Sequence, residues 1–95
     1  MRDKILISII IPYFKKKIFF QKTINSINSQ DFKKFEIILI YDDNDLSELN
    51  YVKQVLKKVK NKIIIVNKKN LGAGISRNKG IQNAKRKFIA FCDAD

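Results

Sequence analysis

The chain of 95 residues contains no histidine, no tryptophan and a single cysteine, Cys92. One cysteine excludes an internal disulfide framework and a cysteine-based metal site. The lack of histidine removes the commonest general base and metal ligand. Cys92 is therefore interpreted as a small apolar residue of a strand, because no histidine is there to activate it as a nucleophile. A chain so poor in cysteine fits a reducing compartment, and we expect it in the cytoplasm.

Long apolar runs are also missing. No segment approaches the ~20 apolar residues that a membrane-spanning helix needs. The opening stretch "MRDKILISIII" resembles a signal peptide only loosely, because Asp3 precedes an apolar run that is short and stops at Pro12. We interpret this stretch as a buried strand, and we expect at most a peripheral position at the inner face of a membrane.

Acidic residues are few: 9 Asp and Glu stand against 20 Lys and Arg, which gives a formal net charge of +11. Such an excess is typical of proteins that bind nucleic acids, anionic membranes or phosphorylated ligands. The lysines are spread over several segments, and four phenylalanines lie in apolar runs that we expect in the core. These are Phe20, Phe35, Phe88 and Phe91. A basic nucleic-acid-binding module is therefore the less favoured alternative, and no nucleic acid is expected as a partner.

Four apolar runs of strand type alternate with three segments of helical periodicity. The expected strands are 5–11, 35–41, 62–66 and 87–92, and the expected helices are 18–30, 46–60 and 73–85. This alternation predicts an α/β fold with a parallel β-α-β-α-β-α-β sheet and helices on both faces. A doubly wound sheet of order 3-2-1-4 places the last strand at an edge. Pro12 is expected to end the first strand, and Asp45 with Glu48 to form a capping box before the second helix.

The carboxyl ends of parallel strands meet at one edge of the sheet, where α/β proteins bind ligands. That edge collects Pro12-Tyr13-Phe14, Asp42-Asp43-Asn44-Asp45, the loop 67–74 and Asp93-Ala94-Asp95. Carboxylates one residue apart, such as Asp93 and Asp95, can hold a hard divalent cation whose shell phosphate oxygens and water complete. Asp43 could instead accept a hydrogen bond from a nucleobase N–H.

Four stretches of the sequence resemble, in order and spacing, successive blocks of the family 2 glycosyltransferases with the GT-A fold. They are "ISIIIPYF", "SINSQDFKKFEIILIYDDND", "NLGAGISRNKGIQNA" and "FIAFCDAD". The resemblance spans nearly all of the chain. It implies a Rossmann-like GT-A half-domain, in which residues 1–95 are the amino-terminal, nucleotide-sugar-binding part of a transferase domain that is cut after the D-x-D sequence.

The resemblance further implies metal-dependent transfer of a sugar from a nucleoside diphosphate sugar, a UDP-sugar above all, to an acceptor glycan or lipid-linked glycan. The nucleotide-sugar-binding residues it implies are Pro12, Tyr13, Asp42, Asp43, Arg77 and Asp93. Among them Asp43 would contact the base, and Asp93 would face the ribose or sugar. Asp95, with Asp93, would hold Mn²⁺ or Mg²⁺ against the diphosphate.

The chain departs from the family pattern at three places. Phe14-Lys15 stands where Tyr-Asn is usual, Asn44-Asp45 where Gly-Ser is usual, and Arg86 where a glycine is common. The family's catalytic base, normally an acid, lies beyond the D-x-D sequence. We therefore assign no catalytic base here, expect it beyond Asp95, and expect residues 1–95 to be inactive alone. A haloacid-dehalogenase-type phosphotransferase also carries D-x-D after a strand, and it is the second alternative.

Overall fold

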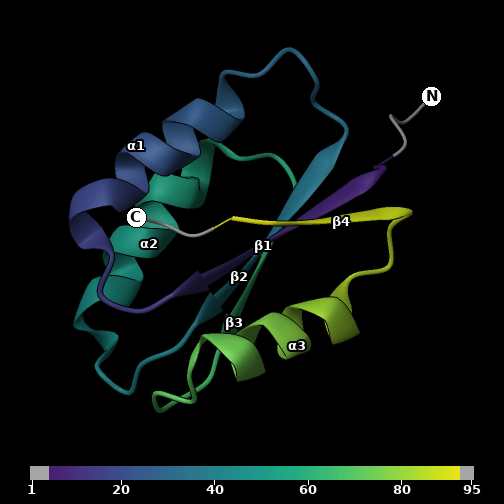
Figure 1. Ribbon diagram of the computed structural model, residues 1–95. Coiled ribbons are helices and arrows are strands. Elements are labelled where there is room, and N and C mark those ends of the chain that lie inside the picture. The colour runs from purple at the N-terminus through teal and green to yellow at the C-terminus, as the bar shows by residue number, and fades with distance from the viewer. Residues whose placement is uncertain (1–4, 93–95) are drawn as a thin grey trace.

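The computed structural model describes residues 5–92, which form a four-stranded parallel sheet with helices on both faces. The strands are β1 (Ile7–Tyr13), β2 (Phe35–Tyr41), β3 (Lys62–Val66) and β4 (Phe88–Phe91), in the order β3-β2-β1-β4 (Figure 1). The helices are α1 (Lys17–Asn28), α2 (Leu49–Val55) and α3 (Ala73–Asn83), and the short 3₁₀ turns Leu46–Glu48 and Leu56–Lys58 flank α2. The predicted fold class and strand order are confirmed, although the predicted helix 46–60 is divided into three pieces.

Side chains of the central strands alternate between two layers of the core. Helices α1 and α2 lie together on one side of the sheet and α3 lies on the other (Figure 1). Ile11 and Leu39 belong to the larger cluster, under α1 and α2, whereas Ile10, Ile38 and Ile40 form a smaller one on the side of α3. Strand β2 is buried at all of its positions. It lies between two strands and under helices on both faces, which explains its nearly continuous apolar sequence.

Pro12 does not end the first strand, contrary to the prediction, because β1 continues through it to Tyr13. Along β1, Ile10 O accepts a hydrogen bond from Cys92 N on the side of β4, and Tyr13 O accepts one from Asp42 N on the side of β2. Successive residues of a strand bond to opposite sides, so the N–H that Pro12 lacks would point to the side of β4. Strand β4 ends opposite Ile10, two residues earlier. The proline therefore removes no bond of the ladder.

The predicted capping box before α2 is only half right. Asp45 does cap the turn, since its Oδ1 accepts a hydrogen bond from Ser47 N at 2.9 Å. A capping box would also have Glu48 accept from Asp45 N, but Asp45 N donates to Asp43 Oδ1 instead, at 3.0 Å. Glu48 Oε2 accepts from the hydroxyl of Tyr13 at 2.6 Å. Asp45 therefore also fixes the backbone just after β2.

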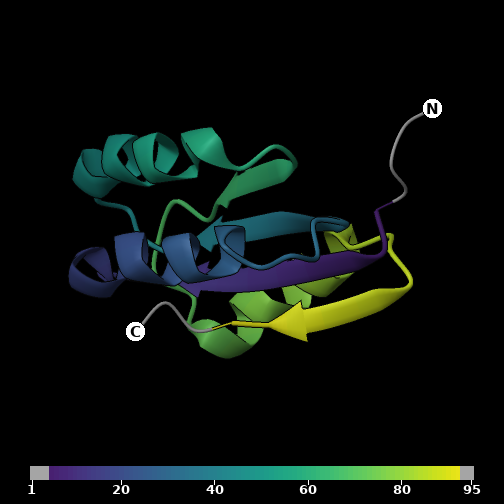
Figure 2. The same ribbon diagram turned by 90° about the horizontal axis from the view of Figure 1, so that it is seen from above.

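Strand β4 is exposed, which corrects one expectation about the core. Phe20 and Phe35 are buried as predicted, but Phe88 and Phe91 are 54% and 52% exposed. Within residues 5–92, β4 pairs only with β1, and Figure 2 shows it at the outer edge of the sheet. Because α3 packs on β1 and β2, neither face of this edge strand is covered well enough to bury its apolar side chains.

A buried polar contact joins β1, β2 and the segment before β4. The hydroxyl of Ser8, which is fully buried, donates to Glu36 Oε2 at 2.6 Å. Arg86 Nε lies 3.3 Å from the same oxygen. A buried carboxylate is costly unless it is paired and hydrogen-bonded, and Glu36 is both. Arg86, one of the three departures from the family pattern, is thus the partner of an acid that the sheet buries.

Helix α3 packs so closely on β1 that Gly80 leaves no room for a side chain. A Cβ atom at Gly80 would lie 2.4 Å from Ile10 Cγ2, and Ile10 is fully buried. Gly74, in the first turn of the same helix, has no atom within 4 Å of the corresponding position. The two glycines therefore have different reasons to be small.

This difference predicts opposite outcomes for the same substitution. We expect Gly80→Ala to lower the free energy of unfolding by about 1–3 kcal/mol, because the methyl group overpacks the contact with Ile10. Gly74→Ala is the matched control and should leave stability unchanged or raise it, by up to about 1 kcal/mol, through helix propensity. Urea unfolding followed by circular dichroism measures both. Equal effects of the two substitutions would contradict the close packing of α3 on β1.

Candidate functional site

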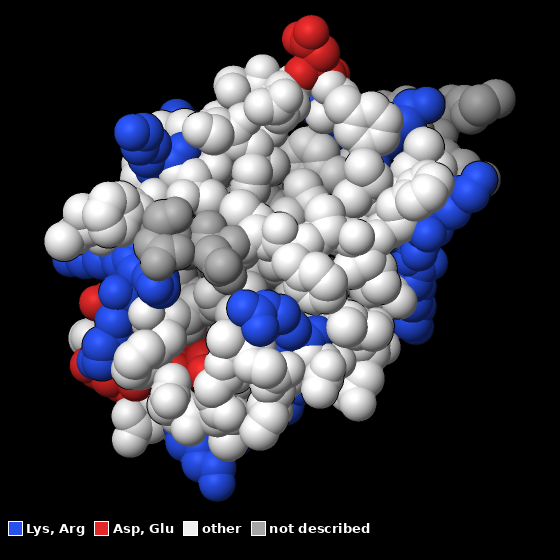
Figure 3. Space-filling model, viewed as in Figure 1, with Lys and Arg blue, Asp and Glu red and all other residues white. Residues whose placement is uncertain are grey.

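The candidate site lies at the carboxyl edge of the sheet, where β1, β2 and β3 end side by side. Beyond the strands the pairing continues for one residue: Asp42 N donates to Tyr13 O at 2.8 Å, and Asn67 N donates to Tyr41 O at 2.9 Å. We call the segments 42–45 and 67–72 the rim. Acidic side chains gather in this region with basic ones beside them (Figure 3).

Asp42 is the centre of the rim and is 2% exposed. Each of its carboxylate oxygens accepts two hydrogen bonds. Oδ1 accepts from Leu71 N at 2.7 Å and from Asn67 Nδ2 at 2.9 Å. Oδ2 accepts from Gly72 N at 2.9 Å and from Asn70 Nδ2 at 3.1 Å. These contacts, the Asp42 network, satisfy the four acceptor positions of a carboxylate.

The Asp42 network positions the loop after β3 and the start of α3. Gly72 caps α3 with φ of 93°, a left-handed conformation in which glycine has no steric penalty. Asn67 Nδ2 also donates to Ser76 Oγ at 3.1 Å, and Asn67 Oδ1 accepts from Lys79 Nζ at 2.7 Å. Neither Ser76 nor Lys79 was predicted as part of the site. Their spacing of three residues in the predicted helix 73–85 places them on one face, but no motif singled them out.

Asp42 was predicted to bind a nucleotide, and that stays a prediction. The described structure gives its carboxylate a different task, since both oxygens are occupied within the chain. Its neighbour Asp43 is differently placed: Oδ1 accepts from Asp45 N at 3.0 Å, and Oδ2 lies 3.5 Å from Lys15 Nζ. The side chain of Asp43 is 9% exposed. Its charged partner, Lys15, is exposed to solvent.

Lys15 holds its ammonium group over Asp43 from a strained backbone position. Its φ is 52°, in the left-handed region, which is uncommon for residues other than glycine and asparagine. Its side chain is 56% exposed. The family pattern has asparagine at this position, which suits the same conformation. The lysine keeps the turn and adds a positive charge beside the carboxylate.

Tyr13 was predicted to line the nucleotide site, but its ring lies in the core below the rim and is fully buried. The ring stacks on Tyr41 at 5.6 Å between centroids and meets the edge of Phe20 at 5.1 Å. Burial, and then the hydrogen bond to Glu48, raises the pKa of the Tyr13 hydroxyl well above its ordinary value, so it stays a donor. A contact of Tyr13 with a nucleotide stays a prediction. Pro12 is half-buried, and its contact with a nucleotide also stays a prediction.

The remaining predicted residues are less closely defined. Arg77 lies in the second turn of α3, partly buried and engaged in contacts of its own. Asp93 and Asp95, the predicted metal ligands, lie outside the described residues. Within residues 5–92 there is no group of three acidic or cysteine side chains placed to hold a metal ion. The predicted Mn²⁺ or Mg²⁺ site therefore stays a prediction.

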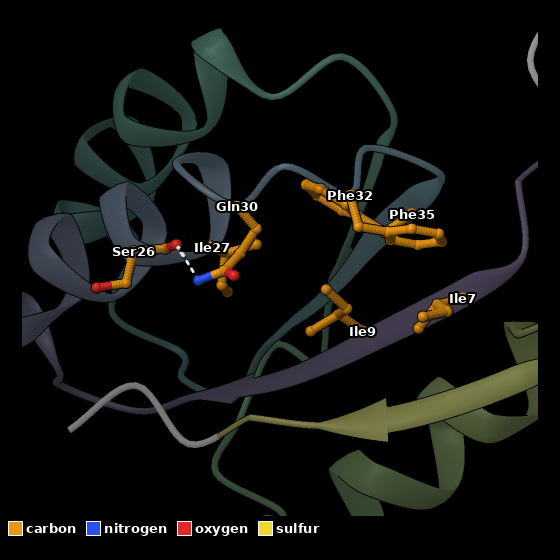
Figure 4. Close-up of a pocket in the computed structure, with 7 residues that line it drawn as sticks. All are labelled: Ile7, Ile9, Ser26, Ile27, Gln30, Phe32 and Phe35. Carbon is orange, nitrogen blue, oxygen red and sulfur yellow. Dashed lines mark hydrogen bonds between the residues drawn. The ribbon is translucent and has the colours of Figure 1, made fainter.

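A cavity of about 260 Å³ lies at the opposite end of the strands, between β1 and the end of α1. Ile7, Ile9, Ile27, Phe32 and Phe35 line most of it, with Ser26 and Gln30 at its side (Figure 4). Ile7 and Tyr13 are the two ends of β1, so the cavity is about 20 Å from the rim. It has no charged side chain and does not contribute to the candidate site.

The Asp42 network predicts a large effect of a small substitution. Asp42→Asn replaces one acceptor oxygen with an amide donor, so two N–H donors lose their acceptor whichever way the amide turns. We expect the free energy of unfolding to fall by about 2–4 kcal/mol. Asp45→Asn is the control: asparagine is an equally good N-cap, and stability should hardly change. Urea unfolding of both variants checks this, and equal losses would contradict the role of Asp42.

Curated proteins with similar sequences are glycosyltransferases. A glycosyltransferase of Methanocaldococcus jannaschii, the uncharacterised MJ1057, is 37% identical over 95 residues. The GalNAc(5)-diNAcBac-PP-undecaprenol beta-1,3-glucosyltransferase of Campylobacter jejuni is 36% identical over 91 residues. These alignments cover 98% and 94% of this chain but only 33% and 29% of the two relatives.

Solved structures show the same fold. The crystal structure of S. aureus TarS 1–349 in complex with UDP-GlcNAc superposes with a TM-score of 0.83 and 25% identity, over 95% of this chain and 26% of that TarS fragment. The same TarS fragment has also been solved with UDP. This chain thus spans about a third or less of the proteins it matches here. The family model described as glycosyl transferase family 2 matches residues 8–95, and so the chain belongs to that family.

Proposed function

We propose that the chain forms the nucleotide-sugar-binding part of a glycosyltransferase that transfers a sugar from a nucleoside diphosphate sugar to an acceptor glycan or lipid-linked glycan. The observation that carries the proposal is the rim. A buried carboxylate, Asp42, shapes it, and a second carboxylate, Asp43, lies beside it, 6% exposed and 3.5 Å from the exposed ammonium group of Lys15. The bound UDP-GlcNAc of TarS supports a UDP-sugar as the donor.

Asp43 is the proposed partner of the nucleobase. Each carboxylate oxygen can accept two hydrogen bonds, so Asp43 can accept from a base N–H while it keeps the bond from Asp45 N. The ammonium group of Lys15, 3.5 Å from Asp43 Oδ2 and 56% exposed at its side chain, is a cation that a diphosphate close by can also contact. Arg77 is proposed to lie near the donor, on the helix that the Asp42 network positions.

Asp95, with Asp93 as a second ligand, is proposed to hold Mn²⁺ or Mg²⁺. Both acids follow β4 directly in the sequence. Two carboxylates leave room for phosphate oxygens and water, which suits a hard cation shared with a diphosphate. Such a cation supplies positive charge that neutralises the diphosphate as it leaves.

The catalytic base is proposed to lie beyond Asp95, because the described acids of the rim, Asp43 among them, and the nearby Glu48 have other partners. Asp42 is saturated with hydrogen bonds, Asp45 caps a turn, and Glu48 accepts from Tyr13. Hydrogen bonds from Ser47, from its backbone N–H first and then its hydroxyl, lower the pKa of Asp45, which makes it a weaker base. We therefore propose that residues 1–95 bind a donor but do not transfer its sugar.

A cytoplasmic location is part of the proposal. No helix within residues 5–92 is both long and apolar enough to cross a membrane.

The family model that matches is a glycosyl transferase model, which favours this function over a haloacid-dehalogenase-type phosphotransferase. The spread of the lysines and the rim of acids favour a nucleotide as the ligand over a nucleic acid.

Calorimetric titration of the chain with UDP tests the proposal. We expect binding in the high micromolar to millimolar range that requires Mn²⁺ or Mg²⁺. Asp43→Ala should abolish it through loss of the base contact, and Asp95→Ala should abolish the metal requirement together with most of the affinity. Asp31→Ala, at an exposed acid before β2, is the matched control and should bind as the unaltered chain does.

Two results would contradict the proposal. One is UDP binding that needs no metal and survives Asp43→Ala. The other is formation of a glycosylated product by residues 1–95 alone in a transferase assay, which would place the base within the chain.

A further inference from the structure

Three large apolar side chains are exposed around the beginning of α1. Phe14 is 39% exposed, Ile18 is 87% exposed and Phe19 is 51% exposed. Ile18 is the most exposed large apolar residue of the described chain. The opposite face of α1 is buried through Phe20 and Ile24, so the helix is already packed on the sheet and does not need these three residues for its own core. They are available to a partner.

Lysines accompany the exposed apolar residues. Lys16 precedes α1, Lys17 is its first residue, and Lys22 follows one turn after Ile18. The first turn of α1 contains no acidic residue, and no side chain caps it. Because the helix dipole disfavours positive charge at an amino terminus, this arrangement weakens the free helix and is relieved by an anionic partner. In Figure 3 basic and uncharged side chains adjoin at the left, where α1 begins in Figure 1.

We propose that this surface, the α1 patch, docks the protein onto an anionic lipid bilayer. The α1 patch consists of Phe14, Ile18, Phe19, Lys16, Lys17 and Lys22. Apolar side chains set among lysines around the start of a helix are typical of helices that lie in a membrane interface. The rings and the isoleucine enter the boundary of the acyl chains, and the lysines extend their charged ends to lipid phosphates.

A second exposed apolar surface, at strand β4, has a different character. Within residues 5–92, β4 presents Phe88, Ile89 and Phe91 together with a backbone edge that pairs with no other strand. An open edge recruits another strand through backbone hydrogen bonds. The α1 patch surrounds the start of a helix and has no strand edge, so a partner meets mainly its side chains. Their charge complements a surface of phosphates.

Docking through the α1 patch would also place the rim. Only three residues separate the end of β1 from the start of α1, and Lys15 in that turn touches Asp43. The rim would therefore lie close to the membrane surface, where a lipid-linked acceptor presents its glycan. This consequence rests on the proposed function, whereas the docking itself does not.

Co-sedimentation of the 95-residue chain with vesicles tests the proposal. We expect binding to vesicles that contain phosphatidylglycerol, a loss of binding as salt is raised, and little binding to phosphatidylcholine alone. The double substitution Lys16→Glu with Lys17→Glu should weaken binding at least about tenfold. Ile18→Ser with Phe19→Ser should weaken it about tenfold at unchanged net charge.

Matched controls separate the α1 patch from general basicity. Lys57→Glu with Lys58→Glu makes the same change of charge at another exposed turn, and Ile75→Ser with Ile81→Ser removes two exposed isoleucines from α3. Both should keep most of the binding, and circular dichroism verifies that every variant is folded. UDP titration of the Ile18/Phe19 variant should be unchanged, so that a failure of docking is distinct from a failure of nucleotide binding.

Three results would overturn the proposal. The first is an absence of binding to anionic vesicles. The second is an equal loss in the control variants, which would show that net charge alone drives the association. The third is binding that duplex DNA displaces and that the Ile18/Phe19 variant retains, which would favour a nucleic acid as the partner of these lysines.

Discussion

The structure of the rim depends on the hydrogen bonds that the chain donates to one buried carboxylate, that of Asp42. Asp42 directly follows β2 and is 2% exposed, and a buried charge must find hydrogen-bond donors within the protein. The loop after β3 provides all four of them. To do so the loop has to fold back over the end of β2, with Gly72 in a left-handed conformation and α3 beginning directly after it. The shape of the rim is thus the consequence of a single electrostatic requirement.

The three departures from the family pattern each have a local partner. Lys15 pairs with Asp43, Asp45 caps the turn before α2, and Arg86 pairs with the buried Glu36. None of them disturbs the sheet or the Asp42 network. The departures therefore alter the charge around the framework of contacts within this chain. Lys15 and Asp45 both contact Asp43, and Lys15 is the one that brings a positive charge to it.

Strand positions and the site edge could be predicted from the sequence because apolar periodicity and strand polarity determine them locally. Contacts between distant segments could not. Pro12 was expected to end a strand, and only the pairing shows that its missing N–H points beyond β4. Phe88 and Phe91 match the pattern of a core strand, yet they lie on an edge strand and are about half exposed within the described residues. Asp42 and Asp43 look equivalent in sequence, and their different tasks follow from a loop about 28 residues away.

The central claim is that a nucleotide binds at the rim, on the framework that Asp42 builds. Its most direct test is an assigned ¹⁵N–¹H NMR spectrum of the chain, titrated with UDP in the presence of Mg²⁺. The account predicts that the amide signals of Asp43, Leu71 and Gly72 shift, while those of Ile9 and Phe35, which line the apolar cavity at the far end of the strands, stay in place. Shifts centred on the cavity, with the rim unchanged, would contradict it.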